Sequence, residues 1–295
     1  MPVGPNDDAA PLTEILNKAR SQSRPARQSE WIHVSDLIGK CIRKIALREQ
    51  QDLPPANQVL TLMDMLTFAV GDTIHDVLKE RTWVGSPSEV WGNWSCKCKK
   101  MQTSEPCLFD QLDHSHACEA CDGGYTQYVE VPMRDDELRI VGTPDLILYL
   151  QSLSALYITE LKSIAHAQWE ELVRPKPEHV IQVLFYWFLM RRLGYRLVAR
   201  ISILYCTKGY VFGGSPIKEF SFDPREIISR LDPYLQEAEE LRRYRREGVI
   251  PIRTMCASDR SPEAKKCEMC STCFGGNENA KPRAISAASA LSGRR

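Results

Sequence analysis

Hydrophobic and polar positions follow two rhythms along this chain, one typical of helices and the other of strands. Apolar residues three or four positions apart predict amphipathic helices, and short continuous apolar runs between turn residues predict strands. The expected helices cover residues 35–46, 64–80, 178–193 and 224–248. In the second of these, the apolar face is expected to consist of Leu66, Ala69, Val70, Ile74, Val77 and Leu78. The expected strands cover residues 138–141, 145–150, 156–162 and 197–206, with edge strands at 210–212 and 217–222. This mixture predicts an α/β fold, and no internal repeat is present.

Capping and turn residues mark several of these boundaries. Ser35 is suited to cap the first helix, which would place Cys41 on that helix. Pro177 and Gly194 bracket the third helix, and a proline and a glycine likewise bracket the fourth. Residues 138–150 are interpreted as strand around a bend at 142–144, and another strand follows at 156–162, so the order is expected to resemble a hairpin.

Residues 91–127 interrupt both rhythms. Cysteine, histidine, glycine and polar residues replace the regular apolar positions there, and neither helix nor strand is expected. The stretch is therefore interpreted as an insertion or small subdomain. The two ends of the chain, residues 1–28 and 276–295, are rich in small, polar and charged residues and are expected to be mobile.

Composition excludes some classes of protein and leaves others open. The 295 residues include 38 basic and 38 acidic side chains, so the formal net charge is zero. This balance argues weakly against a passive DNA coat and is compatible with an enzyme. The N-terminus lacks a signal-peptide pattern, and no apolar run approaches the roughly 20 residues that a membrane helix needs. A soluble cytoplasmic protein without a membrane partner is expected.

The 11 cysteines are expected to be metal ligands or buried thiols and not disulfides, because a secretion signal is lacking. They fall into a single early residue, Cys41, and two clusters at 96–121 and 256–273. Cys206 ends an apolar strand and is expected to be ordinary core.

Four short motifs between the cysteine groups carry catalytic chemistry. They are Gly71-Asp72-Thr73-Ile74-His75, Gly142-Thr143-Pro144-Asp145, Glu160-Leu161-Lys162 and Gln182-Val183-Leu184-Phe185-Tyr186. Phosphodiester cleavage needs a hard divalent cation, for which carboxylates are suitable ligands. The strand period of two puts Glu160 and Lys162 on one face, where the lysine can orient water. A metal and partial burial would both lower the lysine pKa, which allows a base role.

In this order, the four motifs resemble the RecB-like branch of the PD-(D/E)XK nucleases. The resemblance implies a restriction-endonuclease-like mixed sheet flanked by helices. It also implies magnesium or manganese held by His75, Asp145 and Glu160, with Lys162 assisting water activation. Gln182 and Tyr186 would face the metal and the scissile strand, on a helix stripe that also contains His179.

The terminal cysteines extend this resemblance. The segments Val34-Ser35-Asp36-Leu37 and Cys41-Ile42-Arg43-Lys44 are similar to the CRISPR-associated RecB-like exonucleases and the AddB nuclease domain, in which one early and three late cysteines hold a 4Fe-4S cluster. Here four late cysteines stand where that family has three. The favoured set is Cys41, Cys256, Cys267 and Cys273, with Cys270 as the alternate. A rival set is Cys41, Cys267, Cys270 and Cys273, and a local zinc site of the four late cysteines is a further alternative.

The middle cysteines have the spacing of a zinc ribbon. Cys96 and Cys98 form one ligand turn, and Cys118 and Cys121 form a second after a gap of 19 residues. Cys107 is the alternate ligand, and His114 and His116 are further alternatives. Three lysines beside the first turn, at 97, 99 and 100, would either contact phosphates or form a solvated face.

These observations predict a metal-dependent DNA nuclease, expected to be an exonuclease in replication, recombination or repair. Its expected parts are an N-terminal arm (1–28), a helical part (29–90), a zinc-ribbon-like insertion (91–127), a nuclease core (128–250), a cysteine segment (251–275) and a tail (276–295). The expected partners are single-stranded or free-ended DNA and replication or recombination proteins. The compact design is similar to phage-encoded members, which would act in the host cytoplasm. The competing hypotheses are a non-catalytic nucleic-acid-binding or assembly module and an RNA-directed nuclease.

Overall fold

The structure is a computed structural model that describes residues 30–51, 53, 61–115 and 117–275. The predicted mobile arm and tail, residues 1–28 and 276–295, lie outside the described residues, as does His116.

A four-stranded mixed sheet forms the centre of the molecule. Its order is β10 (Ile217–Phe222), β9 (Leu197–Thr207), β8 (Ala155–Ile164) and β7 (Leu146–Leu150). β8 and β9 are parallel, while β7 and β10 are antiparallel to their neighbours. The predicted mixed α/β fold is therefore confirmed, and β7 and β8 form the expected hairpin.

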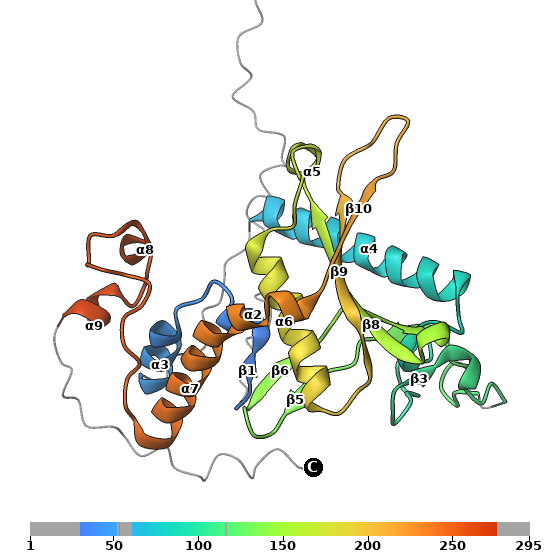
Figure 1. The fold of residues 1–295 in the computed structure, drawn as a ribbon, viewed down its shortest axis with the longest axis horizontal. Coiled ribbons are helices and arrows are strands. Elements are labelled where there is room, and N and C mark those ends of the chain that lie inside the picture. The colour runs from blue at the N-terminus through green and yellow to red at the C-terminus, as the bar shows by residue number, and fades with distance from the viewer. Residues whose placement is uncertain (1–29, 52, 54–60, 116, 276–295) are drawn as a thin grey trace, which may run out of the picture.

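A helical crossover joins the two parallel strands, as parallel pairing requires. The crossover consists of α5 (His166–Glu170) and α6 (Pro177–Arg192), and α6 packs against the sheet (Figure 1). Most of the side chains of α6 are buried, which explains why apolar residues occupy nearly all of its positions. The helix begins at Pro177 and ends before Gly194, whose φ of 85° suits glycine, so the predicted boundaries are confirmed.

A second, three-stranded sheet lies beside α6. β1 (Ile32–His33) pairs in parallel with β6 (Ile140–Gly142), and β5 (Met133–Asp135) pairs antiparallel with β6. The bend after β6 therefore separates strands of different sheets. Gly142 is needed at this bend because a Cβ there would lie 2.8 Å from the ring of Tyr186.

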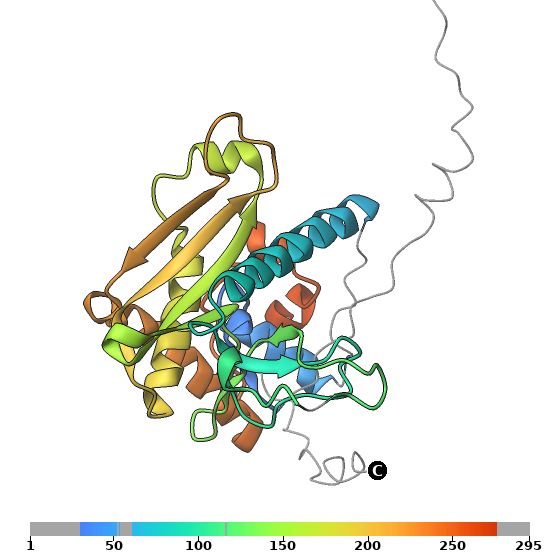
Figure 2. The ribbon, with the colours of Figure 1, turned by 90° about the vertical axis from the view of Figure 1, so that its right-hand side faces the viewer.

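Segments from both ends of the described chain pack together beside this sheet. They are α2 (Val34–Leu37), α3 (Ile42–Gln50), α7 (Asp232–Glu247), α8 (Pro262–Lys265) and α9 (Cys270–Phe274). α3 contacts both α7 and α9, and the views in Figures 1 and 2 agree on this arrangement. Arg245 of α7 donates hydrogen bonds to the Glu49 carboxylate of α3, at 2.7 and 3.3 Å.

Helix α4 (Leu62–Gly85) is longer than predicted; its N-terminal end projects from the body of the molecule, and the helix runs across β8 (Figure 2). Thr61 and Asp64 form a capping box that fixes its start. The prediction of its apolar face was wrong in part: Leu66, Val70 and Val77 are exposed. The packed side instead includes Gly71, Ile74, His75 and Leu78, because only one narrow side of the helix meets the sheet.

The insertion contains a third sheet, which the sequence did not predict. Its order is β3 (Cys107–Leu108), β2 (Trp91–Ser95) and β4 (Gln127–Val129), with a 3₁₀ turn, η1 (Phe109–Gln111), after β3. Trp94 is fully buried and packs against Phe109 with ring centroids 4.7 Å apart. Packing between aromatic side chains therefore stabilises this small sheet, which explains why its sequence lacks a regular pattern of apolar residues.

Several predicted boundaries were wrong. Cys41 does not lie within a helix: it is the N-cap of α3, because Gly39, with φ of 77°, interrupts the predicted helix after α2. His33, not Ser35, occupies the N-cap of α2. Residues 210–212 form no strand and belong to the connection between β9 and β10. Pro224 opens the 3₁₀ turn η3 (Pro224–Glu226), which is followed by η4 (Ile228–Leu231), and α7 begins only at Asp232.

The remaining short element, η2 (Gln151–Leu153), connects β7 to β8. Within the described ranges, we find no helix whose length and hydropathy would let it cross a bilayer.

An ion pair between Asp135 and Arg192 ties β5 to the end of α6. Asp135 is only 5% exposed and also accepts a hydrogen bond from the backbone N–H of Leu138 at 2.8 Å. Burial raises the pKa of Asp135, but Arg192 and the backbone donor outweigh burial, so the pKa lies below its ordinary value. A carboxyl group with a lowered pKa in the folded state stabilises the fold above its ordinary pKa, and this contribution is lost as pH falls.

We predict that Asp135→Asn lowers the free energy of unfolding by about 1–3 kcal/mol at pH 7 because it weakens a charged hydrogen bond. The difference from the unmodified protein should be constant above about pH 5 and shrink below about pH 4. Urea unfolding at several pH values measures it. Glu137→Gln is the matched control, since Glu137 pairs with the same arginine but its side chain is 81% exposed. Equal losses in the two variants would contradict this account.

Candidate active site and metal centres

The β7–β8 hairpin brings two of the predicted carboxylates together. Leu146 pairs with Thr159, so Asp145, one residue earlier, lies across from Glu160. The backbone N–H of Leu161 donates to Asp145 Oδ2 at 2.8 Å and holds this carboxylate against β8. Beyond this rung, β8 continues to Ile164 without β7 beside it, so the carboxylates lie where a sheet edge opens.

His75 of α4 reaches the same place. Its Nδ1 atom lies 3.8 Å from Asp145 Oδ1. Burial lowers the pKa of His75, and the nearby ammonium groups of Lys162 and Lys79 lower it further, against the opposite effect of Asp145. The imidazole is therefore held in its neutral form, which is the form that binds metal ions.

Glu160 is the most deeply buried carboxylate of the site, at 2% exposure. Burial and the negative charge of Asp145 raise its pKa well above the ordinary value, and Lys162 offsets this only in part. One oxygen, Oε1, lies 2.5 Å from Lys162 Nζ, while Oε2 is buried and has no hydrogen-bond partner. A buried oxygen of this kind requires a partner such as a cation.

Burial lowers the pKa of Lys162, as predicted, but the neighbouring carboxylates have the larger opposite effect. The charges of Glu160 and Asp145 together raise the pKa above its ordinary value. The side chain is therefore a protonated ammonium group between the carboxylates. In this state it can donate hydrogen bonds and hold a water or phosphate oxygen, but it cannot accept a proton.

These residues fit a divalent cation. Two close carboxylates, one with an unpartnered buried oxygen, stand beside a neutral imidazole. Hard divalent ions favour oxygen ligands, and an ion would relieve the repulsion between the two carboxylates.

Gln182 and Tyr186 lie together on α6. Gln182 Nε2 donates to the Tyr186 hydroxyl at 2.6 Å, and the Tyr186 ring packs below Gly142. Burial raises the pKa of Tyr186 well above its ordinary value, and the charge of Glu160 adds to the effect. The stripe predicted on this helix is divided, because His179 instead contacts the Tyr205 hydroxyl at 2.8 Å.

Sequence reasoning missed two charged residues next to the site. Lys79 Nζ lies 3.0 Å from Glu130 Oε1, and the charge of Asp145 acts on both side chains. Lys79 follows His75 by four residues, so helix spacing could have indicated that the two share a face. Glu130 lies in the chain after β4, and no local signal marks it.

The middle cysteines form a compact group. The sulfur atoms of Cys96, Cys98, Cys118 and Cys121 all lie within 4.8 Å of one another. Cys98 Sγ is 3.4 Å from Cys96 Sγ and 3.5 Å from Cys118 Sγ. A tetrahedral zinc ion with bonds of about 2.3 Å needs sulfur atoms about 3.8 Å apart, so this geometry fits one ion. Cys107 and His114 lie outside the group, and both neighbour Phe109 in the aromatic packing of the insertion.

The terminal cysteines approach one another where α3 meets the C-terminal segment. Burial raises the pKa of the Cys41 thiol, with further contributions from Cys256 and Cys267. Cys270 is influenced in the same way by burial and then by Asp259 and the three other late cysteines. Arg43 Nε donates to Cys273 Sγ at 3.2 Å. Within the described ranges, these thiols do not form a group as compact as the middle four.

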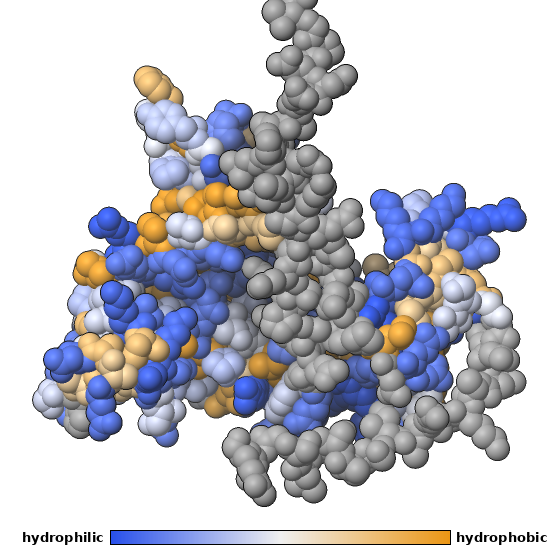
Figure 3. Space-filling view, turned by 180° about the vertical axis from the view of Figure 1, so that it is seen from behind, coloured by the Kyte–Doolittle hydropathy of each residue, from blue (hydrophilic) through white to orange (hydrophobic). Residues whose placement is uncertain are grey.

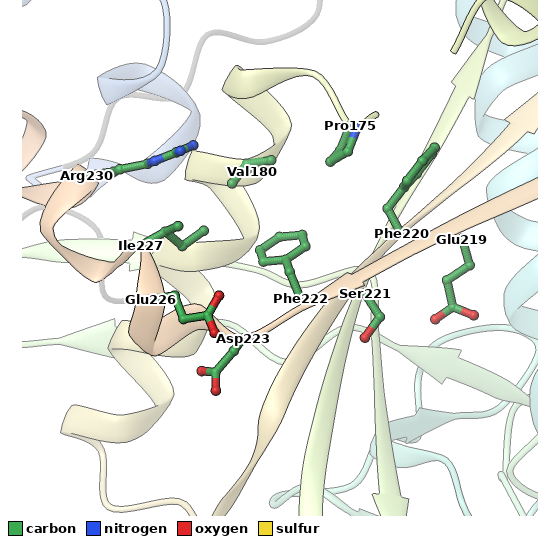
Figure 4. A pocket seen from close by; sticks show the side chains of 10 residues that line it. All are labelled: Pro175, Val180, Glu219, Phe220, Ser221, Phe222, Asp223, Glu226, Ile227 and Arg230. Carbon is green, nitrogen blue, oxygen red and sulfur yellow. The ribbon is translucent and has the colours of Figure 1, made fainter. Parts of the chain in front are cut away.

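A hollow of about 470 Å³ lies at the other edge of the central sheet (Figure 4). Residues of β10, η3 and η4 line it with Val180 of α6. No member of the predicted catalytic set lines this hollow, so we do not assign the chemistry to it.

Comparison with known proteins agrees with the site. Residues 102–273 match the PD-(D/E)XK nuclease superfamily. This span is more than half of the chain, and the protein belongs to that superfamily of nucleases, which use divalent metal ions. The matched residues include Asp145, Glu160 and Lys162, while His75 lies before them.

Other comparisons add less. No curated protein matches the chain. An alkaline exonuclease from Laribacter hongkongensis is similar in structure, at 13% identity and a TM-score of 0.39, over 80% of this chain and 98% of that one. Overlap of this degree does not carry an activity from one protein to the other.

We predict that Cys118→Ser removes the metal ion of the middle group, because a tetrahedral site loses one of four thiolates. Elemental analysis of purified protein should find about one zinc equivalent fewer than in the unmodified chain. Cys107→Ser is the matched control and should keep its zinc, since Cys107 belongs to the same small sheet but not to the group. Loss of zinc from the control alone would show that the ligand set is wrong.

Proposed function

We propose that this protein is a metal-dependent deoxyribonuclease of the RecB-like branch, acting as an exonuclease on DNA that is single-stranded or has a free end. The observation that carries this proposal is the unpartnered, buried oxygen of Glu160 beside Asp145 and protonated Lys162. Burying two carboxylates this close together destabilises the fold unless a cation binds them. Metal-dependent phosphodiester hydrolysis uses a cation held in this way to activate water and stabilise developing charge. Replication, recombination or repair of DNA is the setting that this activity fits.

His75, Asp145 and Glu160 are the residues that would hold magnesium or manganese. When bound, the ion supplies neutralisation of phosphate charge and activation of water. The backbone N–H of Leu161 keeps Asp145 in place, so this carboxylate need not reorganise when a cation or substrate arrives.

Lys162 is assigned to orienting the attacking water or a phosphate oxygen. Its ammonium group is held by Glu160 Oε1 at 2.5 Å, which fixes its direction at the open edge of β8. Gln182 and Tyr186 are assigned to substrate positioning. Their mutual hydrogen bond at 2.6 Å limits the orientations of the amide and hydroxyl groups beside the carboxylates.

The two cysteine groups are assigned structural roles. Zinc held by Cys96, Cys98, Cys118 and Cys121 would stabilise a ribbon-like insertion next to β7. We assign a 4Fe-4S cluster to Cys41, Cys256, Cys267 and Cys273, with Cys270 as the alternate. This assignment is supported by the influence of Cys256 and Cys267 on the Cys41 thiol, and by the hydrogen bond from Arg43, two residues after Cys41, to Cys273 Sγ. Such a cluster would join α3 to the C-terminal segment, as in the family that the chain resembles. Iron analysis after anaerobic purification tests this assignment, and iron retained in Cys41→Ser would contradict it.

The cleavage activity has a direct test. We predict that the protein degrades end-labelled DNA with manganese or magnesium and not with EDTA. Asp145→Asn and Glu160→Gln should each lower the rate by on the order of 10²-fold or more, because each removes a charge from the cation site. Glu80→Gln is the matched control on α4 and should cleave at the unmodified rate, since Glu80 is an exposed carboxylate five residues from His75.

Matched DNA and RNA strands labelled at either end decide the substrate and the direction of cutting. Metal-dependent cutting of RNA alone would contradict the DNA assignment. Absence of cutting by protein with intact metal centres would favour a non-catalytic nucleic-acid-binding module.

The Lys79–Glu130 pair allows a test of the cation site in which removing the negative charge and removing the positive charge should have opposite effects on manganese binding. We predict that Glu130→Gln raises the manganese concentration for half-maximal cleavage by about two- to tenfold, because Lys79 loses its partner at 3.0 Å and its positive charge then acts more strongly on the cation site at Asp145. Lys79→Met should lower this concentration, because it removes a positive charge. Metal titrations of the cleavage rate measure both, and shifts of the same sign would contradict the electrostatic explanation.

A further inference from the structure

The connection between β9 and β10 presents two aromatic side chains to solvent. Tyr210 is 82% exposed and Phe212 is 91% exposed, although both are large and apolar. Their rings are neighbours, with centroids 6.5 Å apart and planes at 61°. Exposed aromatic side chains grouped at a projecting turn indicate a binding surface more often than isolated surface residues do. We refer to Tyr210 and Phe212 as the hairpin tip.

The base of this hairpin is fixed to the rest of the fold. The backbone N–H of Lys208 donates to the Ile164 carbonyl at 2.8 Å, and that of Gly209 donates to Thr207 Oγ1 at 3.1 Å. Gly209 approaches α5 so closely that a Cβ would lie 2.6 Å from His166 Cβ. The tip is therefore carried on an anchored support, which favours a defined role in binding.

The hairpin tip lies at the end of the strand that contains the candidate catalytic residues. Glu160 and Lys162 lie where β8 runs on past the end of β7, and this strand ends at Ile164, which pairs with Thr207 just before the hairpin. At about 3.3 Å per residue, four residues of strand separate Glu160 from this point by roughly 13 Å. A polynucleotide bound at the carboxylates can therefore reach the tip within a few nucleotides.

Helix α4 borders the same route. Lys208 Nζ donates to the Thr67 carbonyl at 2.9 Å, which fixes the hairpin base against this helix. Met63, Leu66 and Val70 are exposed on the nearby half of α4. Seen from behind, hydrophobic residues form a band over α4 with the hairpin projecting above it (Figure 3). Apolar and aromatic side chains are thus exposed at this end of the site, beside Lys208.

We propose that the hairpin tip is a stacking platform for the bases of a single-stranded DNA segment that extends from the active site. This proposal rests on the proposed nuclease function and names the form of substrate that the site takes. Aromatic rings bind bases of any sequence through their faces, whereas phosphates are bound by cations and backbone donors. The tip is apolar and has a fixed base, so it suits unpaired bases, whose faces are exposed, and not a duplex, whose bases are stacked on each other.

Binding measurements in the cleavage-inactive Glu160→Gln background test this platform. Fluorescent single strands of about 12 nucleotides, long enough to span from the carboxylates to the tip, should bind about tenfold or more weakly after Tyr210→Ala with Phe212→Ala. Tyr210→Trp with Phe212→Trp should restore binding, because tryptophan retains the aromatic face. Leu153→Ala is the matched control, since Leu153 is also an exposed apolar residue but lies at the opposite end of β8.

Removal of bases from the DNA provides an independent readout. A strand with abasic sites a few nucleotides from the cleaved bond should bind the protein with an intact tip as weakly as the complete strand binds the double alanine variant. Combining both changes should give no further loss, because each removes the same contact.

The outcomes separate this inference from the proposed function. Normal DNA cleavage together with unchanged single-strand binding by the double alanine variant would overturn the platform alone, and the tip would then be a surface for a protein partner. Failure of the unmodified protein to bind or cut DNA would overturn the proposed function and the platform with it. Circular dichroism of each variant verifies the fold, which exposed side chains should not affect.

Discussion

The contact between Asp145 and the backbone N–H of Leu161 is the constraint on which the active site depends. It places one carboxylate across from Glu160 inside the fold, where the two negative charges repel and neither is well solvated. Lys162 neutralises only part of this charge and leaves one oxygen of Glu160 without a partner. The sheet thus holds two carboxylates at a short distance, and a divalent cation can relieve their repulsion. The surrounding structure must stabilise this arrangement against that repulsion.

Two helices, α6 and α4, pack against β8 and stabilise this arrangement. Helix α6 is almost fully buried and positions Gln182 and Tyr186, while α4 positions His75 beside Asp145. Glycine allows close approach at two points: Gly142 lies against the Tyr186 ring, and Gly71 lets α4 meet β8 near Ser163. A larger residue at Gly142 would move α6 away from the carboxylates, and a larger residue at Gly71 would move α4 away from them.

Both cysteine groups lie outside the main apolar core of the molecule. The middle group lies beyond β2, whose neighbours include β7, so a metal ion there would restrain the strand that follows Asp145. The terminal thiols lie where α3 meets the C-terminal segment, far along the chain from each other. A shared centre at that place would close a long loop, which reduces the entropy of the unfolded chain.

The sequence by itself determined the mixed α/β class, most helices and strands, the face shared by Glu160 and Lys162, and the spacing of the middle cysteines. These properties depend on periodicity and on neighbours a few residues apart, which are local. Only the tertiary structure decided that Lys79 and Glu130 stand beside Asp145, that Cys41 lies between helices, and that the rings of Tyr210 and Phe212 lie together in the connection between β9 and β10. The physical reason is that such placements depend on how distant segments pack, and packing joins residues that no local pattern relates.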